Sequence, residues 1–243
     1  MEPPKGTRDV FGERAERKKR LILALHDAFT AYGFDYVETP SFERFEVLTA
    51  KFAGGEEILS EIFRLSDRGE RDLALRFDHT VPLGRFVASH PELSLPFKRY
   101  AIGSSYRDGP LKKGRLREFT QADADIVGAH GVESEIELLR LAADVFSDLD
   151  VPVDIRVNHR VILESIVKTH DSDADVESVI LTLDKLEKSG RSAVEKELEA
   201  KGVADPHALL ERFSRSFKDL EGFAASYGAP DGVLDRAFAD VKR

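Results

Sequence analysis

Apolar positions recur at two different spacings in the first part of the chain, and these spacings separate helices from strands. Leu21, Leu25 and Phe29 recur at helical spacing and predict a helix over residues 13–32. Alternating apolar and polar positions predict a hairpin around a polar loop. The remaining predictions are strands at 34–39, 62–66, 72–77 and 153–157 and helices at 45–52, 133–149 and from Pro82 to before Pro91, the last one capped by Thr80.

From His159 onward the pattern changes, and no further strand is predicted. Helices are expected at 159–168, 174–188, 190–201, 206–225 and 231–241. The change near residue 168 predicts two domains, 1–168 and 169–243. The fold class expected is therefore α+β, with an antiparallel sheet flanked by helices and followed by a helical segment.

Residues 98–127 differ most from the rest of the chain, because they predict two strands joined by a loop rich in glycine and positive charge. Between Lys98 and Arg117 there are seven Lys or Arg residues and one acidic residue, whereas the net charge of the whole chain is −9. A local reversal of sign this strong makes phosphate the first candidate ligand.

Side chains on a strand alternate between its two faces, so odd and even positions from residue 115 separate. The even positions are small or apolar enough to lie against helices. The odd positions are Arg115, Arg117, Phe119, Gln121, Asp123 and Asp125. Burying such polar groups without partners costs about 1–3 kcal/mol each, so either water or a polar ligand covers this face.

The order of residues along the odd face predicts a graded site. Arg107 ends the first strand and lies near Arg115 and Arg117, where forked donors can bind phosphate oxygens. Phe119 offers a flat surface to a base, and Gln121 and Asp125 lie deeper, as acceptors for an amine or imidazole. The local pattern is equally compatible with a solvated basic hairpin that binds nothing.

Composition narrows the class of protein. The content of 42% hydrophobic and 33% charged residues is typical of a soluble globular chain, and no apolar run is long enough for a membrane helix. Without cysteine, and without an apolar signal at the start, a cytoplasmic location is expected. The seven His are scattered, so no structural metal is expected. The pI near 5.4 argues against indiscriminate nucleic-acid binding.

Several segments together resemble the class II aminoacyl-tRNA synthetases, in the form used by histidyl-tRNA synthetase. Tyr106-Arg107 and Gly114-Arg115-Leu-Arg-Glu-Phe119-Thr-Gln121-Ala-Asp-Ala-Asp125-Ile-Val-Gly resemble motif 2 of that family. Leu-Arg-Phe-Asp78-His-Thr80-Val-Pro resembles its histidine-binding segment, and Lys5-Gly-Thr-Arg-Asp resembles its opening. Gly33-Phe and Val37-Glu-Thr-Pro resemble motif 1, which forms the dimer in that family.

The resemblance implies histidine activation by ATP, with Mg²⁺ on the phosphates, followed by transfer to tRNA(His) by a homodimer formed through residues 13–40. Arg107 would bind the α-phosphate and the histidine carboxylate, Arg115 the outer phosphates, and Phe119 would stack on adenine. The residues implied for histidine are Asp78, Thr80 and Gln121 at the α-amino group and Asp125 at the imidazole. Catalysis would consist mainly of positioning and electrostatic stabilisation.

Two departures from the family pattern qualify this interpretation. The acidic residue Asp108 lies one position after Arg107 instead of two, so no adenine contact is assigned to it. The Arg-Gly-Leu-Asp-Tyr-Tyr type of segment, motif 3 and an anticodon-binding domain do not occur in the 243 residues. We therefore expect the N-terminal, incomplete catalytic portion of such an enzyme, with weak ATP–pyrophosphate exchange on its own.

Two alternatives remain open at this stage. One is a non-catalytic relative, such as the regulatory subunit of ATP phosphoribosyltransferase, which shares the fold and senses histidine. The other is a truncated paralogue that acts as a binding module. Arg107, Arg115 and Phe119 favour an ancestor that used ATP, because a histidine sensor has no need of arginines that bind phosphate.

Overall fold

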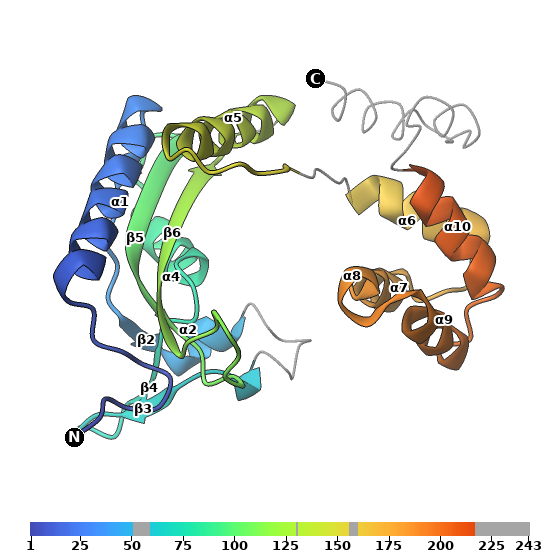
Figure 1. The fold of residues 1–243 in the computed structure, drawn as a ribbon, viewed down its shortest axis with the longest axis horizontal. Helices are drawn as coiled ribbons and strands as arrows, with labels where there is room; N and C mark the ends of the chain where they lie inside the picture. The colour runs from blue at the N-terminus through green and yellow to red at the C-terminus, as the bar shows by residue number, and fades with distance from the viewer. Residues whose placement is uncertain (51–58, 130, 156–159, 217–243) are drawn as a thin grey trace. The chain divides into compact units, whose positions relative to one another are not determined.

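The computed structural model describes residues 1–50, 59–129, 131–155 and 160–216 (Figure 1). The chain forms two compact units, Met1–Val153 and Asp154–Arg243. The boundary predicted at residue 168 differs from this division, because it lies within helix α6 (Arg160–His170). The apolar side of α6 packs into the helical core of the second unit.

The main sheet of the first unit has the strand order β1-β5-β6. Its strands are β1 (Asp35–Tyr36), β5 (Phe97–Tyr106) and β6 (Glu118–Val127). β1 pairs in parallel with β5, and β5 pairs antiparallel with β6 over their full length. This register places Arg99 opposite Asp125 and Gly103 opposite Gln121.

Helices α1 (Gly12–Ala31) and α5 (Val132–Asp148) cover one face of the β5–β6 pair (Figure 1). The core between them contains Phe29, Phe34, Tyr100, Leu141 and Val145. Ala124 and Ile126 of β6 pack against this core. The expectation that the even face of this strand lies against helices is therefore confirmed for its second half, whereas Thr120 and Ala122 are exposed.

A second, smaller sheet has the order β2-β4-β3 and is antiparallel throughout. Its strands are β2 (Phe42–Arg44), β3 (Arg64–Ser66) and β4 (Asp72–Leu75), and the associated helices are α2 (Phe45–Ala50) and α4 (Thr80–Ala88). Their shared core contains Leu48, Ile62, Ala74 and Phe77. The α+β class predicted from the sequence is confirmed.

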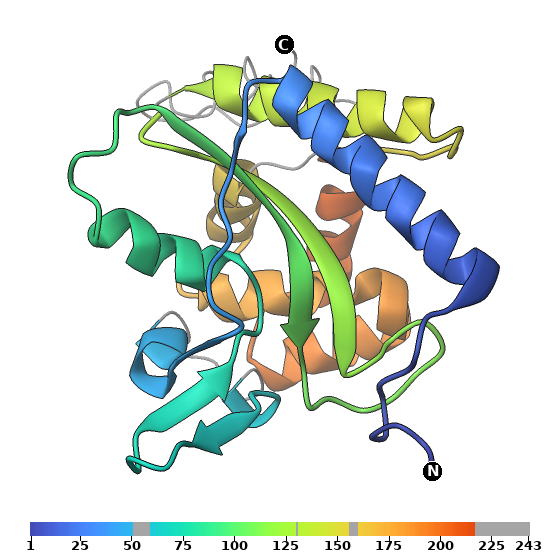
Figure 2. The ribbon, with the colours of Figure 1, turned by 90° about the vertical axis from the view of Figure 1, so that its left-hand side faces the viewer.

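The loop between β5 and β6 corrects the predicted start of the second strand. β6 begins at Glu118 and not at residue 115. A tight turn at Lys113-Gly114 comes first, where Gly114 has φ of +82°. The N-terminal segment runs beside this loop (Figure 2), and the main-chain N–H of Arg117 donates to Gly6 O at 2.8 Å. These contacts hold residues 107–117 as an ordered loop.

The second unit is helical in its described part. Its helices are α6, α7 (Val176–Leu183), α8 (Leu186–Ser189), α9 (Arg191–Ala200) and α10 (Pro206–Ser216). The helix predicted at 174–188 is instead two, separated at Asp184-Lys185. The strand predicted at 153–157 has no regular structure up to Ile155, and its last two residues lie outside the described residues. The end of the helix predicted at 206–225 and the whole helix predicted at 231–241 also lie outside the described residues.

Within the described ranges, every helix is too short or too polar to cross a membrane.

Candidate functional site

The predicted site residues lie on two segments that are far apart in sequence. One is the odd-numbered face of β6, and the other is the turn from β4 into α4, residues 77–80. Arg99 joins the two, because it pairs with Asp125 of β6 and donates to His79 O at 3.0 Å. The structure therefore brings the proposed histidine-binding segments together on the face of β6 that is turned away from the α1–α5 core.

Arg107 lies between two aromatic rings at the loop end of the hairpin. Its Cζ is 4.2 Å from the ring centroid of Phe77 and 5.1 Å from that of Phe119. Among the described residues no carboxylate forms an ion pair with Arg107. Its Nε donates a long hydrogen bond, 3.5 Å, to Phe77 O. The rings fix the plane of the guanidinium and leave its fork available to an anion.

The other two arginines of the predicted cluster lie at the same end but are bound to carboxylates. Arg115 Nη2 donates to both oxygens of Glu61, at 2.9 and 2.8 Å. Arg117 pairs with Asp108 at 2.8 Å. Asp108, whose role the sequence left open, thus anchors Arg117. Glu61 was missed, since no local signal in the sequence links it to the loop.

Gln121 is oriented by its neighbour on the same strand face. Its Nε2 donates to both carboxylate oxygens of Asp123, at 2.9 and 3.0 Å. The opposite amide orientation would set Oε1 against an anion, so this assignment is the chemically consistent one. Gln121 Oε1 is then buried without a hydrogen-bond partner among the described residues. The arrangement presents a carbonyl acceptor. Asp123 lies on the predicted face, but its role in orienting Gln121 was missed.

The residue that caps the start of α4 differs from the prediction. Thr80 does not cap α4; it is the first residue of that helix and is exposed. Asp78, which is 8% exposed, accepts from the main-chain N–H of Val81 at 3.0 Å and so caps the helix start. The reason is geometric, because an N-terminal cap must precede the first helical turn.

Asp125 contacts a buried cation. Arg99 Nη2 lies 2.7 Å from Asp125 Oδ2, and the Arg99 side chain is 2% exposed. Burial lowers the pKa of Arg99, and the nearby carboxylates of Asp125, Asp123 and Asp78 oppose that shift. The guanidinium remains charged at any physiological pH. Three carboxylates therefore act on one cation, of which Asp125 contacts it. Arg99 was missed because its partner depends on strand register.

His79 lies beside the same network and is 2% exposed. Burial, followed by the positive charge of Arg76, lowers the pKa of the His79 imidazole. The site is crowded there, since a Cβ added to Gly103 would lie 2.7 Å from Arg76 Nη2 and 3.3 Å from His79 Cε1. A side chain at residue 103 would therefore require the buried Arg76 to shift, and His79 is a neutral group within this site.

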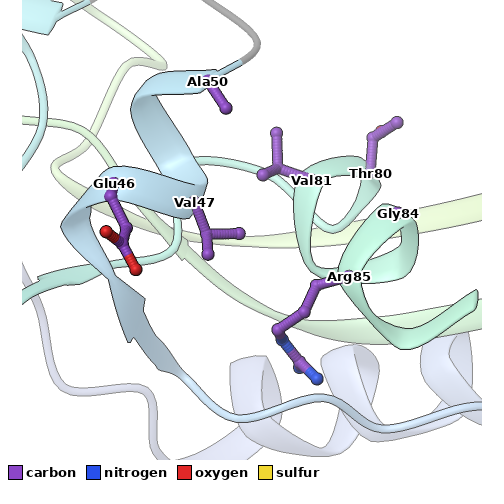
Figure 3. Close-up of a pocket in the computed structure, with 7 residues that line it drawn as sticks. All are labelled: Glu46, Val47, Ala50, Thr80, Val81, Gly84 and Arg85. Carbon is purple, nitrogen blue, oxygen red and sulfur yellow. The ribbon is translucent and has the colours of Figure 1, made fainter. Parts of the chain in front are cut away.

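A cavity of 770 Å³ lies between α2 and α4 (Figure 3). Val47 of α2 and Val81 of α4 point toward each other across it, and of the predicted site residues only Thr80 lines it. Residues 51–58 follow α2 directly and lie outside the described residues, so this cavity supports no separate assignment. Within the described ranges, no group of three His, Asp or Glu residues is placed to hold a metal ion.

Comparison with known proteins decides the family. The sequence profile described as "Histidyl-tRNA synthetase" matches residues 6–238. The chain belongs to the histidyl-tRNA synthetase family. Within this family, "Histidine--tRNA ligase 1" of Bacillus thuringiensis subsp. konkukian is 43% identical over 240 residues, which are 96% of this chain and 56% of that protein. The chain spans about half the length of the curated relatives it matches.

Solved structures agree with the family assignment. Histidyl-tRNA synthetase from Nostoc sp. PCC 7120 matches with a TM-score of 0.79 and 26% identity, over 100% of this chain and 56% of that one. A Bacillus halodurans structure titled as an ATP phosphoribosyltransferase regulatory subunit/histidyl-tRNA synthetase matches with a TM-score of 0.81, over 100% of this chain and 63% of that one. Its identity is 19%, so this second likeness shows the fold alone.

Proposed function

We propose that this chain supplies the histidine-binding and part of the ATP-binding surface of a class II histidine–tRNA ligase. The reaction joins histidine to ATP, giving histidyl-adenylate and pyrophosphate, and then transfers the histidyl group to the 3′ end of tRNA(His). The observation that supports it best is that two acceptors lie on one strand face: the Asp125 carboxylate, and Gln121 Oε1, which is buried without a hydrogen-bond partner among the described residues.

The end of the β6 face that carries Gln121 and Asp125 suits the two N–H donor groups of histidine, which are the α-amino group and the imidazole. Gln121 Oε1 and the carboxylate of Asp78 would accept from the α-amino group, together with the exposed hydroxyl of Thr80. Asp125 would accept from an imidazole N–H. A carboxylate has about four acceptor positions, so its pairing with Arg99 does not exclude this second bond. Desolvated, charge-assisted bonds of this kind give both affinity and selectivity.

The loop end suits ATP. Arg107, held between two rings, would contact the α-phosphate and the histidine carboxylate, and would stabilise the charge that develops as the carboxylate attacks phosphorus. Phe119 would stack on adenine. Arg115 would reach the outer phosphates by exchanging Glu61 for them. Mg²⁺ would enter with ATP as part of that substrate.

Assembly and location complete the proposal. A homodimer through residues 13–40 is supported by apolar side chains on α1 and the adjoining strands, of which Leu23 is 52% and Tyr36 47% exposed. A cytoplasmic location is supported by the absence of cysteine from the sequence.

The regulatory-subunit alternative is less well supported. Its structural likeness lies at 19% identity, whereas ligases match at 43%. The fork of Arg107 between two rings is a further feature that a histidine sensor would not need.

Calorimetric titration of histidine into the 243-residue chain tests the proposal. Asp125→Ala should weaken histidine binding at least tenfold, because the imidazole loses its charge-assisted partner. Asp148→Ala, which removes an exposed carboxylate at the end of α5, should leave affinity unchanged. Equal affinity of the Asp125→Ala chain and the unmodified chain would refute the assignment of this pocket.

A further inference from the structure

Arg99 is a full positive charge at the middle of the sheet. It is 1% exposed, lies on β5 between two paired strands, and stands directly opposite Asp125 in the register. Removing such a charge from water is costly, and an ion pair in that position rarely adds net stability over apolar side chains of similar volume. Its presence therefore calls for a reason other than stability.

The contacts of Arg99 suggest that reason. Its Nη2 binds Asp125 Oδ2 at 2.7 Å and His79 O at 3.0 Å. Asp125 belongs to β6, whereas His79 lies between the two turn residues proposed to bind the α-amino group. One guanidinium thus ties together the two segments from which histidine would be recognised. Its Nε is buried without a partner in the described part of the chain, which costs free energy. The side chain is therefore placed to make these two contacts and not to satisfy all of its own donors.

Charge balance points the same way. Asp78, Asp123 and Asp125 all act on Arg99 electrostatically. Like charges on neighbouring side chains repel one another, and a cation in contact with one of them offsets that repulsion. Arg99 provides that cation on the same face of the sheet, because it stands directly opposite Asp125 in the ladder and contacts its carboxylate. The oxygens of Asp125 are then held where one of them can accept a hydrogen bond from an imidazole N–H.

We propose that Arg99 is the positioning residue for histidine recognition: it fixes the orientation of the Asp125 carboxylate and locks the turn at residues 78–80 against the sheet. This inference rests on the proposed function, because it concerns how the same pocket recognises its ligand. Arg99 does not touch histidine; it acts through Asp125 and the turn.

The experiment compares histidine binding by the unmodified chain, Arg99→Met and Arg99→Lys, measured by calorimetry at pH 8. Arg99→Met should bind at least tenfold more weakly. The same substitution made in the Asp125→Asn chain should cost severalfold less, because Arg99 acts through the carboxylate that this second change removes.

Arg99→Lys keeps the charge but cannot bridge both partners, so we expect affinity to fall about threefold. This variant decides the matter if circular dichroism shows that Arg99→Met does not fold. Histidine binding by the unmodified chain, together with unchanged affinity in every folded Arg99 variant, would overturn the role of Arg99 and leave the proposed function intact. An equal weakening by Arg99→Met in the unmodified chain and in the Asp125→Asn chain would show a structural role only and overturn the inference. No histidine binding by the unmodified chain would overturn both.

Discussion

Replacing His79 by glutamine should flatten the dependence of stability on pH. In the folded protein burial and the neighbouring Arg76 lower the pKa of this imidazole. In the unfolded chain it titrates near its ordinary value of about 6.5. Because the folded-state pKa is depressed, its contribution to stability is fully present above about pH 6.5 and is lost as the pH falls toward the folded-state value.

The size of the effect has an upper limit. One proton bound only by the unfolded chain gives a slope of about 1.4 kcal/mol per pH unit. Integrated from pH 7.5 to pH 5, this amounts to about 2 kcal/mol for a folded protein that keeps His79 neutral throughout. Carboxylates with a lowered pKa, such as Asp67 and Glu197, act mainly below about pH 5, where unfolded carboxyl groups become protonated.

Urea unfolding at pH 5, 6 and 7.5, followed by tyrosine fluorescence, measures this contribution. The chain has no tryptophan, and four of its five tyrosines lie in residues 1–153, so the signal reports mainly on the first unit. The His79→Gln chain should lose most of the decline in unfolding free energy between pH 7.5 and 5, whereas His90→Gln should retain it. An equal decline in unmodified and His79→Gln chains would refute the argument from burial.

Two further substitutions test the loop and the strand face. Gly6→Ala should lower the unfolding free energy by about 2 kcal/mol, because φ is +89° and the added Cβ would lie 2.7 Å from Arg117 Cγ. Urea unfolding measures this loss of unfolding free energy. Asp123→Asn should weaken histidine binding about fivefold by calorimetry, since an amide no longer fixes the orientation of Gln121 and about 1 kcal/mol of charge-assisted bonding is lost.

Each of these two substitutions has a matched control variant. Gly114 has φ of +82° but no atom within 4 Å of an added Cβ, so Gly114→Ala introduces backbone strain without overlap. An equal loss of stability in Gly6→Ala and Gly114→Ala would contradict the predicted overlap. For the strand face, Asp108→Asn removes a carboxylate from the loop and should not change histidine affinity. The orienting role of Asp123 is excluded if its variant binds histidine as tightly as Asp108→Asn.

The sequence predicted the two faces of β6 because alternation along a strand is a local property. It did not predict which side chains meet across strands. Arg99 contacts Asp125 through the register of β5 and β6, and Glu61 contacts Arg115 through the packing of a distant segment on the loop. Such pairs depend on where separate segments meet, and no periodicity encodes that.

Local chemistry was ambiguous where two neighbouring residues could do the same task. Asp78 and Thr80 are both good helix caps. The helix begins at Thr80, two residues before Pro82, which makes Asp78 the cap. Residues 115–117 alternate like a strand, but the turn at Gly114 and the bond from Arg117 to Gly6 take them out of the ladder. Tertiary hydrogen bonds decided both cases.

β6 is the last strand of the main sheet within the described part of the chain, so the outer side of its backbone meets no described strand. An edge of this length is a template for strand addition. The residues proposed to bind histidine, Gln121 and Asp125, project from that same strand. Whatever pairs with the edge, whether further polypeptide or another copy, would stiffen the wall of the pocket. Ligand affinity and assembly at this edge are consequently linked equilibria, and each should respond to the other.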